Sequence, residues 1–179
     1  MDKKQVSNLV NLLGRMKTLR RAGWVKRQVK NPESDADHSY SLAFLTMLLA
    51  PENLDLLKCL KLALVHDLPE AFCGDFIPGE LEPTEKSSLE RSAMQKVCND
   101  LKKPELMELF SEYEQHQTPE AQFVWAIDRL DNVFTANFYE SKSGPKLTEE
   151  FASSALPRLA SLDDKNLSKN LQKILKALY

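Results

Sequence analysis

Apolar side chains recur at helical spacing from the start of the chain, and this periodicity constrains the fold more than any other feature. The first set consists of Val6, Leu9, Val10, Leu13, Met16 and Leu19. Such spacing predicts an amphipathic helix with one buried face. Composition agrees, because Leu and Ala supply 43 of the 179 residues, whereas Val, Ile and Thr together supply 17. The sequence therefore predicts an all-α protein and excludes an all-β fold.

Helix-breaking residues divide the rest of the chain. Gly23 and Asn31-Pro32 predict a loop over 21–32, and a second loop is predicted over 73–83. Further helices are expected over 34–50, 54–70, 84–101, 104–117, 119–141, 148–156 and 163–178. Ser34 and Asp35 are suited to cap the first of these. Because no repeat or Gly/Ser linker interrupts the pattern, we expect one helical-bundle domain over 1–179, with a core at about 12–140 and C-terminal helices at about 146–179.

Cysteine content and hydropathy point to a reduced, cytoplasmic protein. The three cysteines are odd in number and form no CxxC pair, which argues against a disulfide framework or a zinc knuckle. The most apolar stretch, Leu42–Ala50, is too short to span a bilayer. We therefore expect no membrane partner.

Charge is unevenly distributed along the chain. Residues 3–32 carry nine basic side chains and no acidic one, so the remaining residues hold 15 basic and 26 acidic side chains. A cationic lobe on an acidic body suits a small anionic ligand better than a nucleic acid polymer, which needs a broad basic face. A solvated basic helix end would also explain most of these cations.

Two histidines and two aspartates lie on predicted apolar helix faces. His38 shares a face with Leu42 and Leu45, and His66-Asp67 ends a Leu-rich segment. Asp128 lies among the apolar residues of the 119–141 helix. An ionised carboxylate in an apolar bundle is costly unless it is paired or bound to a cation.

Side chains from three helices can converge on one metal ion inside a bundle. Imidazole and carboxylate ligands without thiolate suit Mn, Fe, Co, Ni or Zn, with Mg an option if more oxygens join. The alternative is that His38 and His66 are hydrogen-bonded core residues and that Asp128 caps or pairs with a neighbouring element. Residue types alone leave both interpretations open.

Four ordered motifs add to this pattern. They are R-x-G-W at 21–24, E-S-x-x-x-H-S at 33–39, H-D-x-x-E-x-x-x-G-D-x-x-P at 66–78 and D-R-L at 128–130. Over about residues 12–140 the chain resembles the HD-domain phosphohydrolases, and within them the small 5′-deoxynucleotidase branch of the HD-domain-containing protein 2 type. The resemblance implies an HD-type helical bundle with a metal site in its core.

The resemblance also implies residue roles. It assigns one divalent cation to His38, His66, Asp67 and Asp128. It gives Glu70 and Asp75 catalytic roles at the water or the leaving group, and a second cation in some members. It assigns phosphate binding to Arg21 and places Trp24 beside the nucleoside. Asp75, on the loop at Gly74, is a further candidate for a contact to the sugar. These substrate-binding and catalytic assignments are expectations about Arg21, Trp24, Glu70 and Asp75.

The departures from the family pattern are Pro69, which removes an amide donor within the His-Asp-x-x-Glu turn, and Asp131. Neither falls on an implied ligand. His116 lies in a polar helix end, where we expect it to be solvated, and nothing marks Cys73 as a nucleophile.

The resemblance favours a metal-dependent phosphomonoesterase that hydrolyses nucleoside 5′-monophosphates, with deoxy forms preferred, and it favours a homodimer. The metal would be Mn, Co, Mg, Fe, Ni or Zn. Two alternatives stay open. One is an HD-type hydrolase acting on a cyclic nucleotide or a guanosine alarmone. The other is a non-catalytic bundle that binds a nucleotide or a protein partner.

Overall fold

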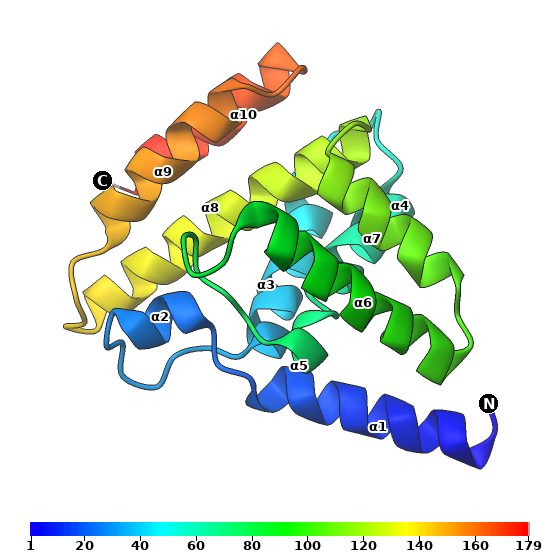
Figure 1. Ribbon diagram of the computed structural model, residues 1–179. Helices are drawn as coiled ribbons and strands as arrows, with labels where there is room; N and C mark the ends of the chain where they lie inside the picture. Colours follow the sequence, from blue (N-terminus) through cyan, green and yellow to red (C-terminus); the bar gives the residue numbers. More distant parts are fainter. Residues whose placement is uncertain (179) are drawn as a thin grey trace. The chain divides into compact units, whose positions relative to one another are not determined.

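The computed structural model describes residues 1–178, which fold into ten helices with no strand (Figure 1). The helices are α1 (Lys3–Thr18), α2 (Ala22–Lys26), α3 (Asp35–Leu49), α4 (Leu56–Val65), α5 (Glu70–Cys73), α6 (Pro83–Leu101), α7 (Glu105–Gln115), α8 (Pro119–Ser141), α9 (Thr148–Ala160) and α10 (Lys165–Lys176). The all-α prediction is confirmed. The chain groups into two compact units: a first unit of residues 1–40 and 64–111, and a second unit of residues 41–63 and 112 onward. The expectation of a single domain stays a prediction.

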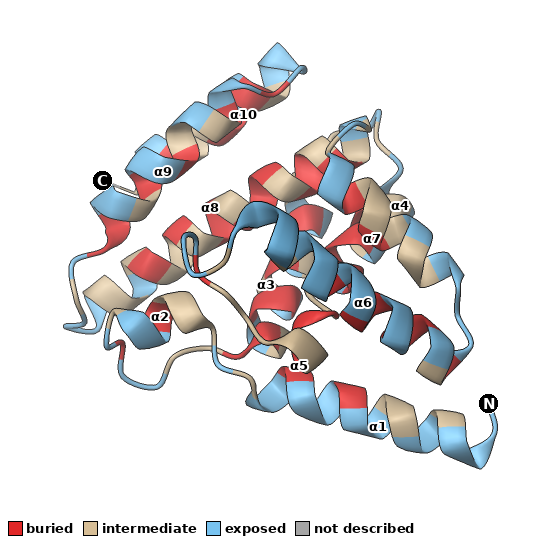
Figure 2. Cartoon of the chain, viewed as in Figure 1, coloured by how far each residue is buried: buried red, intermediate tan, exposed pale blue. Residues whose placement is uncertain are grey.

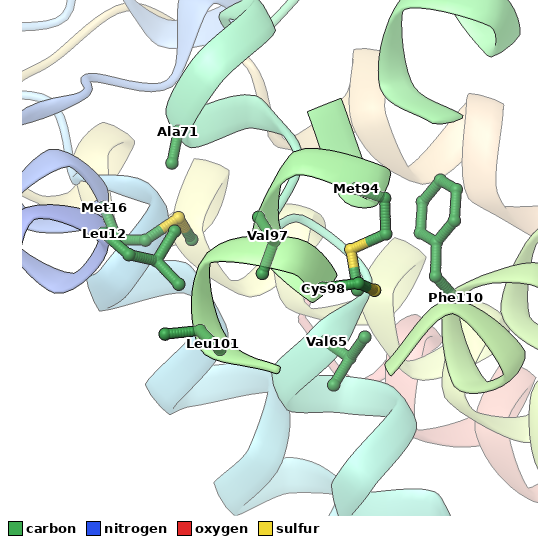
Figure 3. Packing of buried hydrophobic residues seen from close by; sticks show 9 residues of the cluster. All are labelled: Leu12, Met16, Val65, Ala71, Met94, Val97, Cys98, Leu101 and Phe110. Carbon is green, nitrogen blue, oxygen red and sulfur yellow. The ribbon is translucent and has the colours of Figure 1, made fainter. Parts of the chain in front are cut away.

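The core of the first unit is a cluster of apolar side chains from α1, the end of α4, α5, α6 and α7 (Figure 3). Its buried members are Leu12, Met16, Val65, Ala71, Met94, Val97, Cys98, Leu101 and Phe110. Met94 is fully buried, so its truncation to Ala would cost about 2–5 kcal/mol. This cluster fixes α5, the short helix that follows the His66-Asp67 pair.

Helix α1 confirms the first predicted helix but buries a narrower stripe than its sequence suggests. Of the predicted set only Met16 is buried, and the second buried residue, Leu12, lies outside that set. Val10 is 66% exposed, and most of α1 faces solvent (Figure 2). At its beginning, the Asp2 carboxylate accepts a hydrogen bond from the backbone N–H of Gln5, and the Gln5 side chain accepts one from Asp2. This reciprocal capping box sets where the helix begins.

The segment predicted as a loop over 21–32 contains the helix α2, so that prediction is wrong for residues 22–26. An isolated bridge between Arg20 and Ser34 closes the segment, and the backbone N–H of Arg21 donates to the carbonyl of Glu33 at 3.1 Å. These contacts hold both ends of the segment together, which places Arg21 beside the beginning of α3.

The single helix predicted over 54–70 is also wrong, because the structure divides this segment. Helix α4 ends at Val65, a turn follows, and α5 begins at Glu70. Within the turn, the N–H groups of Leu68 and Glu70 donate to carbonyls three residues earlier. Pro69 precedes α5 at its N-cap, where a missing amide donor costs no intrahelical bond. The proline therefore stabilises the break.

The second unit includes α8, α9 and α10, which contact one another. Thr118 caps α8 as predicted, since its hydroxyl accepts a hydrogen bond from the N–H of Ala121. Helix α9 extends to Ala160, beyond the predicted end at 156. The apolar stripes of α9 and α10 are buried at Leu159, Leu171 and Leu175. Among residues 1–178, no helix combines the length and the apolar character needed to cross a membrane.

Candidate metal centre

His38 is positioned by the first turn of α3. The backbone N–H and hydroxyl of Ser34 both donate to Asp37 Oδ2, at 2.9 and 2.8 Å, and the N–H of Asp37 donates back to the Ser34 hydroxyl. This arrangement confirms Ser34 as a cap, whereas Asp35 is the first residue of the helix. His38 follows one turn later and is fully buried.

His66 and Asp67 lie in the turn after α4, and the structure brings them together with His38. Asp67 Oδ2 is 3.0 Å from His66 Nε2 and 3.6 Å from His38 Nε2. The two imidazole rings meet edge to face with their centroids 5.4 Å apart. One ligand atom from each residue lies within 4.8 Å of the others. We call these three residues the histidine cluster.

Arg21 lies at the edge of this cluster. Its Nη1 is 2.7 Å from Asp67 Oδ2 and 3.7 Å from Glu70 Oε2, and its side chain is only 15% exposed. Arg21 is the residue before α2 and directly follows Arg20, which forms the isolated bridge with Ser34. A side chain predicted to bind phosphate therefore also pairs with a predicted metal ligand, Asp67, and with a predicted catalytic carboxylate, Glu70.

The surroundings of Asp67 favour its ionised form. Burial alone raises the pKa of this carboxyl, but His66 and then Arg21 outweigh burial and hold the pKa below its usual range. Asp67 is therefore a carboxylate at neutral pH, as a metal ligand must be.

A second group of carboxylates lies in the same unit: Asp35, Glu70 and Asp75, each offering an oxygen within 4.8 Å of the others. We call these three residues the acidic cluster. Asp75 Oδ2 accepts a hydrogen bond from the N–H of Ala22 at 2.6 Å. Gly74 directs Asp75 to this position, because its φ of +90° and ψ of 159° form a backbone conformation that side chains disfavour.

Two carboxyls of the acidic cluster, Glu70 and Asp35, have raised pKa values, in contrast to Asp67. Burial, followed by repulsion from Asp67, raises the pKa of Glu70. Burial and repulsion from Asp67 likewise raise the pKa of Asp35 to about 7. The sequence predicts only a capping role for Asp35, so its place in the acidic cluster with Glu70 and Asp75 was missed. The available signal was a carboxylate one helical turn before a predicted metal ligand.

Trp24 lies on α2 and is 2% exposed, in contrast to a residue on an open polar loop. Its indole Nε1 donates to Glu33 Oε1 at 2.8 Å. The indole therefore belongs to the packed interior near α2. Its contact with a nucleoside stays a prediction.

Asp128 belongs to the second unit and has several partners there. Its Oδ2 accepts a hydrogen bond from the Tyr113 hydroxyl at 3.2 Å and lies 3.3 Å from Arg129 Nη2. Its Oδ1 accepts one from Asn132 Nδ2 at 3.0 Å. The residue is 4% exposed, and the neighbouring departure Asp131 is also buried. A buried, oriented carboxylate suits a metal ligand, and the assignment of Asp128 to the cation stays a prediction.

Two residues that the sequence analysis set aside also have defined surroundings. His116 is half-buried, with its ring 4.9 Å from that of Trp125, so the expectation of a solvated side chain is wrong. The apolar partner was not apparent because it lies nine residues away on the next helix. Burial raises the pKa of the Cys73 thiol to about 12, which keeps it protonated and unreactive.

The donor atoms of the first unit fit a divalent cation. The histidine cluster offers two imidazole nitrogens and a carboxylate oxygen, a set typical of Mn, Fe, Co, Ni and Zn. The acidic cluster offers oxygen only, and both Asp35 oxygens and Glu70 Oε2 are buried without a hydrogen-bond partner in residues 1–178. Buried polar atoms of this kind need a counter-charge.

A helical scaffold with a buried His-Asp pair after one helix and a second histidine on another defines a class of metal-binding hydrolase folds. Residues 13–171 match the HD domain family HD_3, and the chain belongs to this family. The human 5′-deoxynucleotidase HDDC2 is 37% identical over 142 residues, which cover 76% of this chain and 69% of the relative. The 5′-deoxynucleotidase hdd1 of Schizosaccharomyces pombe is 38% identical over 151 residues, covering 79% and 76%.

Solved structures of proteins with similar sequences have the same fold as this chain. The PH0347 protein from Pyrococcus horikoshii has a TM-score of 0.83 and 36% identity, with 97% of each chain covered. A conserved hypothetical protein from Pyrococcus furiosus has a TM-score of 0.84 and 35% identity, covering 96% of this chain and 99% of the other. A predicted metal-dependent phosphohydrolase from Magnetospirillum magnetotacticum has a TM-score of 0.74 and 25% identity, covering 98% and 93%.

Proposed function

We propose that this protein is a metal-dependent phosphomonoesterase that hydrolyses nucleoside 5′-monophosphates to nucleoside and phosphate, with deoxyribonucleotides preferred. The observation that carries the proposal is the convergence of His38, His66 and Asp67, whose ligand atoms lie within 4.8 Å of one another. The names of the curated relatives, 5′-deoxynucleotidases, support the substrate class.

His38, His66, Asp67 and Asp128 would hold one divalent cation, and Glu70 with Asp75 would hold a second. The candidate metals are Mn, Co, Mg, Fe, Ni and Zn, and the concentration of each metal in the cell would decide which of them is bound. When bound, a divalent cation supplies Lewis acidity, which makes a water molecule more acidic and withdraws charge from a phosphoryl group.

Arg21 would bind the phosphate. Its guanidinium lies 2.7 Å from Asp67, so a phosphate that it binds is held beside the histidine cluster. A guanidinium can donate two parallel hydrogen bonds to phosphate oxygens, which fixes the orientation of the group as well as its charge. The side chain is 15% exposed, so little water competes for these bonds.

When no second cation occupies Glu70 and Asp75, Glu70 would act as the general acid, because a carboxyl that holds a cation carries no proton. Burial raises its pKa, so the carboxyl retains its proton closer to neutral pH than an exposed Glu does. Water attacks phosphorus as the bond from phosphorus to the 5′-oxygen breaks, and the departing oxygen takes the Glu70 proton. A proton of the attacking water then restores the Glu70 carboxyl. Asp75 and Trp24 would contact the nucleoside, with Asp75 held by the N–H of Ala22.

We also propose a cytoplasmic location and a homodimer. The three thiols are free in the structure, and Cys59 and Cys98 are buried, which suits a reducing compartment. Exposed apolar side chains on α3, namely Phe44, Met47 and Leu48, offer a surface for a second chain. Light scattering after gel filtration tests the dimer, and a monomeric mass would contradict it.

Phosphate release from a panel of nucleoside monophosphates tests the activity. We expect release with Mn²⁺ or Co²⁺, faster for deoxyribose than for ribose substrates, and no release with excess chelator. Cyclic nucleotides and guanosine alarmones serve as the comparison substrates. The absence of turnover by protein that has bound metal, or faster turnover of a comparison substrate, would contradict the proposal.

A further inference from the structure

Asp35 differs from every other buried carboxylate of the first unit in having no partner. It is 0% exposed, and neither carboxylate oxygen has a hydrogen-bond partner among residues 1–178. Its backbone is satisfied, because its N–H donates to the carbonyl of Leu19 and its carbonyl accepts from the Ser39 hydroxyl at 2.8 Å. The side chain therefore contributes nothing to the local hydrogen bonding that orders this turn.

The other acidic side chains nearby are compensated. Asp67 is 2.7 Å from Arg21, and Asp75 accepts the N–H of Ala22. Glu90, also buried, is 3.0 Å from Lys86 Nζ. A buried carboxylate without such a partner is strongly destabilising in its ionised form, so an ionised Asp35 calls for a cation supplied from outside the chain.

The position of Asp35 indicates what supplies that charge. One of its oxygens lies within 4.8 Å of oxygens of Glu70 and Asp75, so the three carboxylates face a common point. They come from α3, α5 and the loop after α5, and α5 is fixed by the apolar cluster. Three convergent carboxylate oxygens on separate elements suit a small, hard cation.

We infer that Asp35 is a ligand of the cation assigned to Glu70 and Asp75, and that this third carboxylate makes the site all-oxygen and selective for Mg²⁺ or Mn²⁺. The inference rests on the proposed function only in taking Glu70 and Asp75 as cation ligands. Oxygen-only sites favour Mg²⁺ and Mn²⁺, whereas the imidazoles of the histidine cluster favour later transition metals. The two clusters would thus hold cations of different chemistry.

The test counts bound Mn²⁺ by equilibrium dialysis and elemental analysis of chelator-treated protein. We expect two Mn²⁺ per chain for the wild type. Asp35→Asn keeps the side-chain shape and removes the charge, and it should retain one Mn²⁺ while weakening the second about 10- to 100-fold. Asp100→Asn is the control, because Asp100 belongs to the same unit but pairs with Lys96 outside both clusters, and it should bind Mn²⁺ as the wild type does.

A His66→Ala background isolates the acidic cluster. We expect this variant to bind a single Mn²⁺, and the double variant with Asp35→Asn to bind it about 10- to 100-fold more weakly. Unchanged Mn²⁺ binding on adding Asp35→Asn, or a wild type that binds one Mn²⁺ only, would overturn the inference. A wild-type measurement covers the case in which Asp35→Asn fails to fold: excess Mg²⁺ should displace one of the two Mn²⁺ ions, and displacement of neither or of both would overturn it.

Phosphate release by the same samples separates the two claims. Protein that shows Asp35-dependent Mn²⁺ binding but no turnover of any nucleotide would contradict the proposed function and support the ligand assignment. Turnover by a wild type that binds one Mn²⁺ would support the proposed function and overturn the assignment of Asp35.

Discussion

The two clusters of the first unit hold their charge in opposite ways. In the histidine cluster, Asp67 is surrounded by His38, His66 and Arg21, and its pKa lies below the usual range. In the acidic cluster, Asp35 has no partner, and its pKa is raised to about 7. A carboxylate with partners is held in its ionised form ready for a ligand, whereas one without partners indicates where the protein requires an external charge.

The largest effect is expected from removing the compensated carboxylate. Asp67→Ala leaves the two imidazoles and Arg21 without their shared anion, so we expect loss of one cation and a fall in kcat of about 10³-fold or more. Elemental analysis and phosphate release measure the two effects together. Asp100→Ala, which removes a half-buried carboxylate paired with Lys96 outside both clusters, is the control. Retained metal and activity in Asp67→Ala would contradict the assignment of the histidine cluster.

Glu70→Gln tests the acidic cluster without changing side-chain shape. Because the amide cannot donate a proton to the leaving oxygen, we expect kcat to fall about 10²- to 10³-fold. The cation of the histidine cluster should stay bound. With a leaving group of low pKa, such as p-nitrophenolate, we expect Glu70→Gln to retain the wild-type kcat, because such a group leaves without taking a proton. An equal loss for both substrates would contradict a general-acid role.

Arg21 lies beside Asp67 of the histidine cluster and Glu70 of the acidic cluster. Replacing it with Lys distinguishes the contribution of its positive charge from that of its planar guanidinium. Arg21→Lys keeps the charge near Asp67 and Glu70 but loses the planar fork, and we expect kcat/KM to fall about 10- to 100-fold, nearly as far as in Arg21→Ala. Steady-state kinetics on one nucleotide provides the measurement. Full activity of Arg21→Lys would mean that only the charge of Arg21 matters.

The pH dependence of stability distinguishes the clusters in metal-free protein. Unfolded Asp35 loses its proton near pH 4, whereas folded Asp35 retains it up to about pH 7, so the unfolded state binds fewer protons in this range. Asp35 therefore lowers stability as pH rises from about 4 to about 7, by at most about 1.4 kcal/mol for each pH unit. Thermal melts with chelator should show Asp35→Asn gaining stability over the wild type as pH rises. Parallel curves for the two proteins would contradict this.

The smallest effect is expected from replacing His116, which belongs to neither cluster. His116→Ala removes a ring that packs on Trp125, so we expect a loss of about 1 kcal/mol in the free energy of unfolding. Metal content and kcat should not change. Chemical denaturation and elemental analysis test this, and loss of a cation would show that a ligand has been missed.

Much of the fold could be predicted from local sequence signals. The beginning of α8 follows from Thr118-Pro119, because a capping hydroxyl and an N1 proline act within one turn. The break between α4 and α5 was missed because the leucine periodicity continues to Leu68, and only Pro69 hinted at an interruption. Helix α2 was missed for a similar reason: Gly23 predicts a loop, but burial of Trp24 stabilises one helical turn around it.

In the site, too, local sequence signals could be used for prediction, whereas contacts made by tertiary packing could not. His38, His66 and Asp67 could be selected from the sequence because the motifs carry them, and the structure brings these three together. The lack of a hydrogen-bond partner for the Asp35 carboxylate could not be predicted. It depends on which atoms face it across α5 and the loop at Asp75, and these contacts are set by tertiary packing rather than by spacing along α3.

Anomalous diffraction from crystals soaked in Mn²⁺ tests the central claim most directly. The account predicts a peak within about 2.0–2.3 Å of a nitrogen of His38, a nitrogen of His66 and an oxygen of Asp67. A fully occupied Mn²⁺ site elsewhere, with no peak between these three side chains, would contradict it.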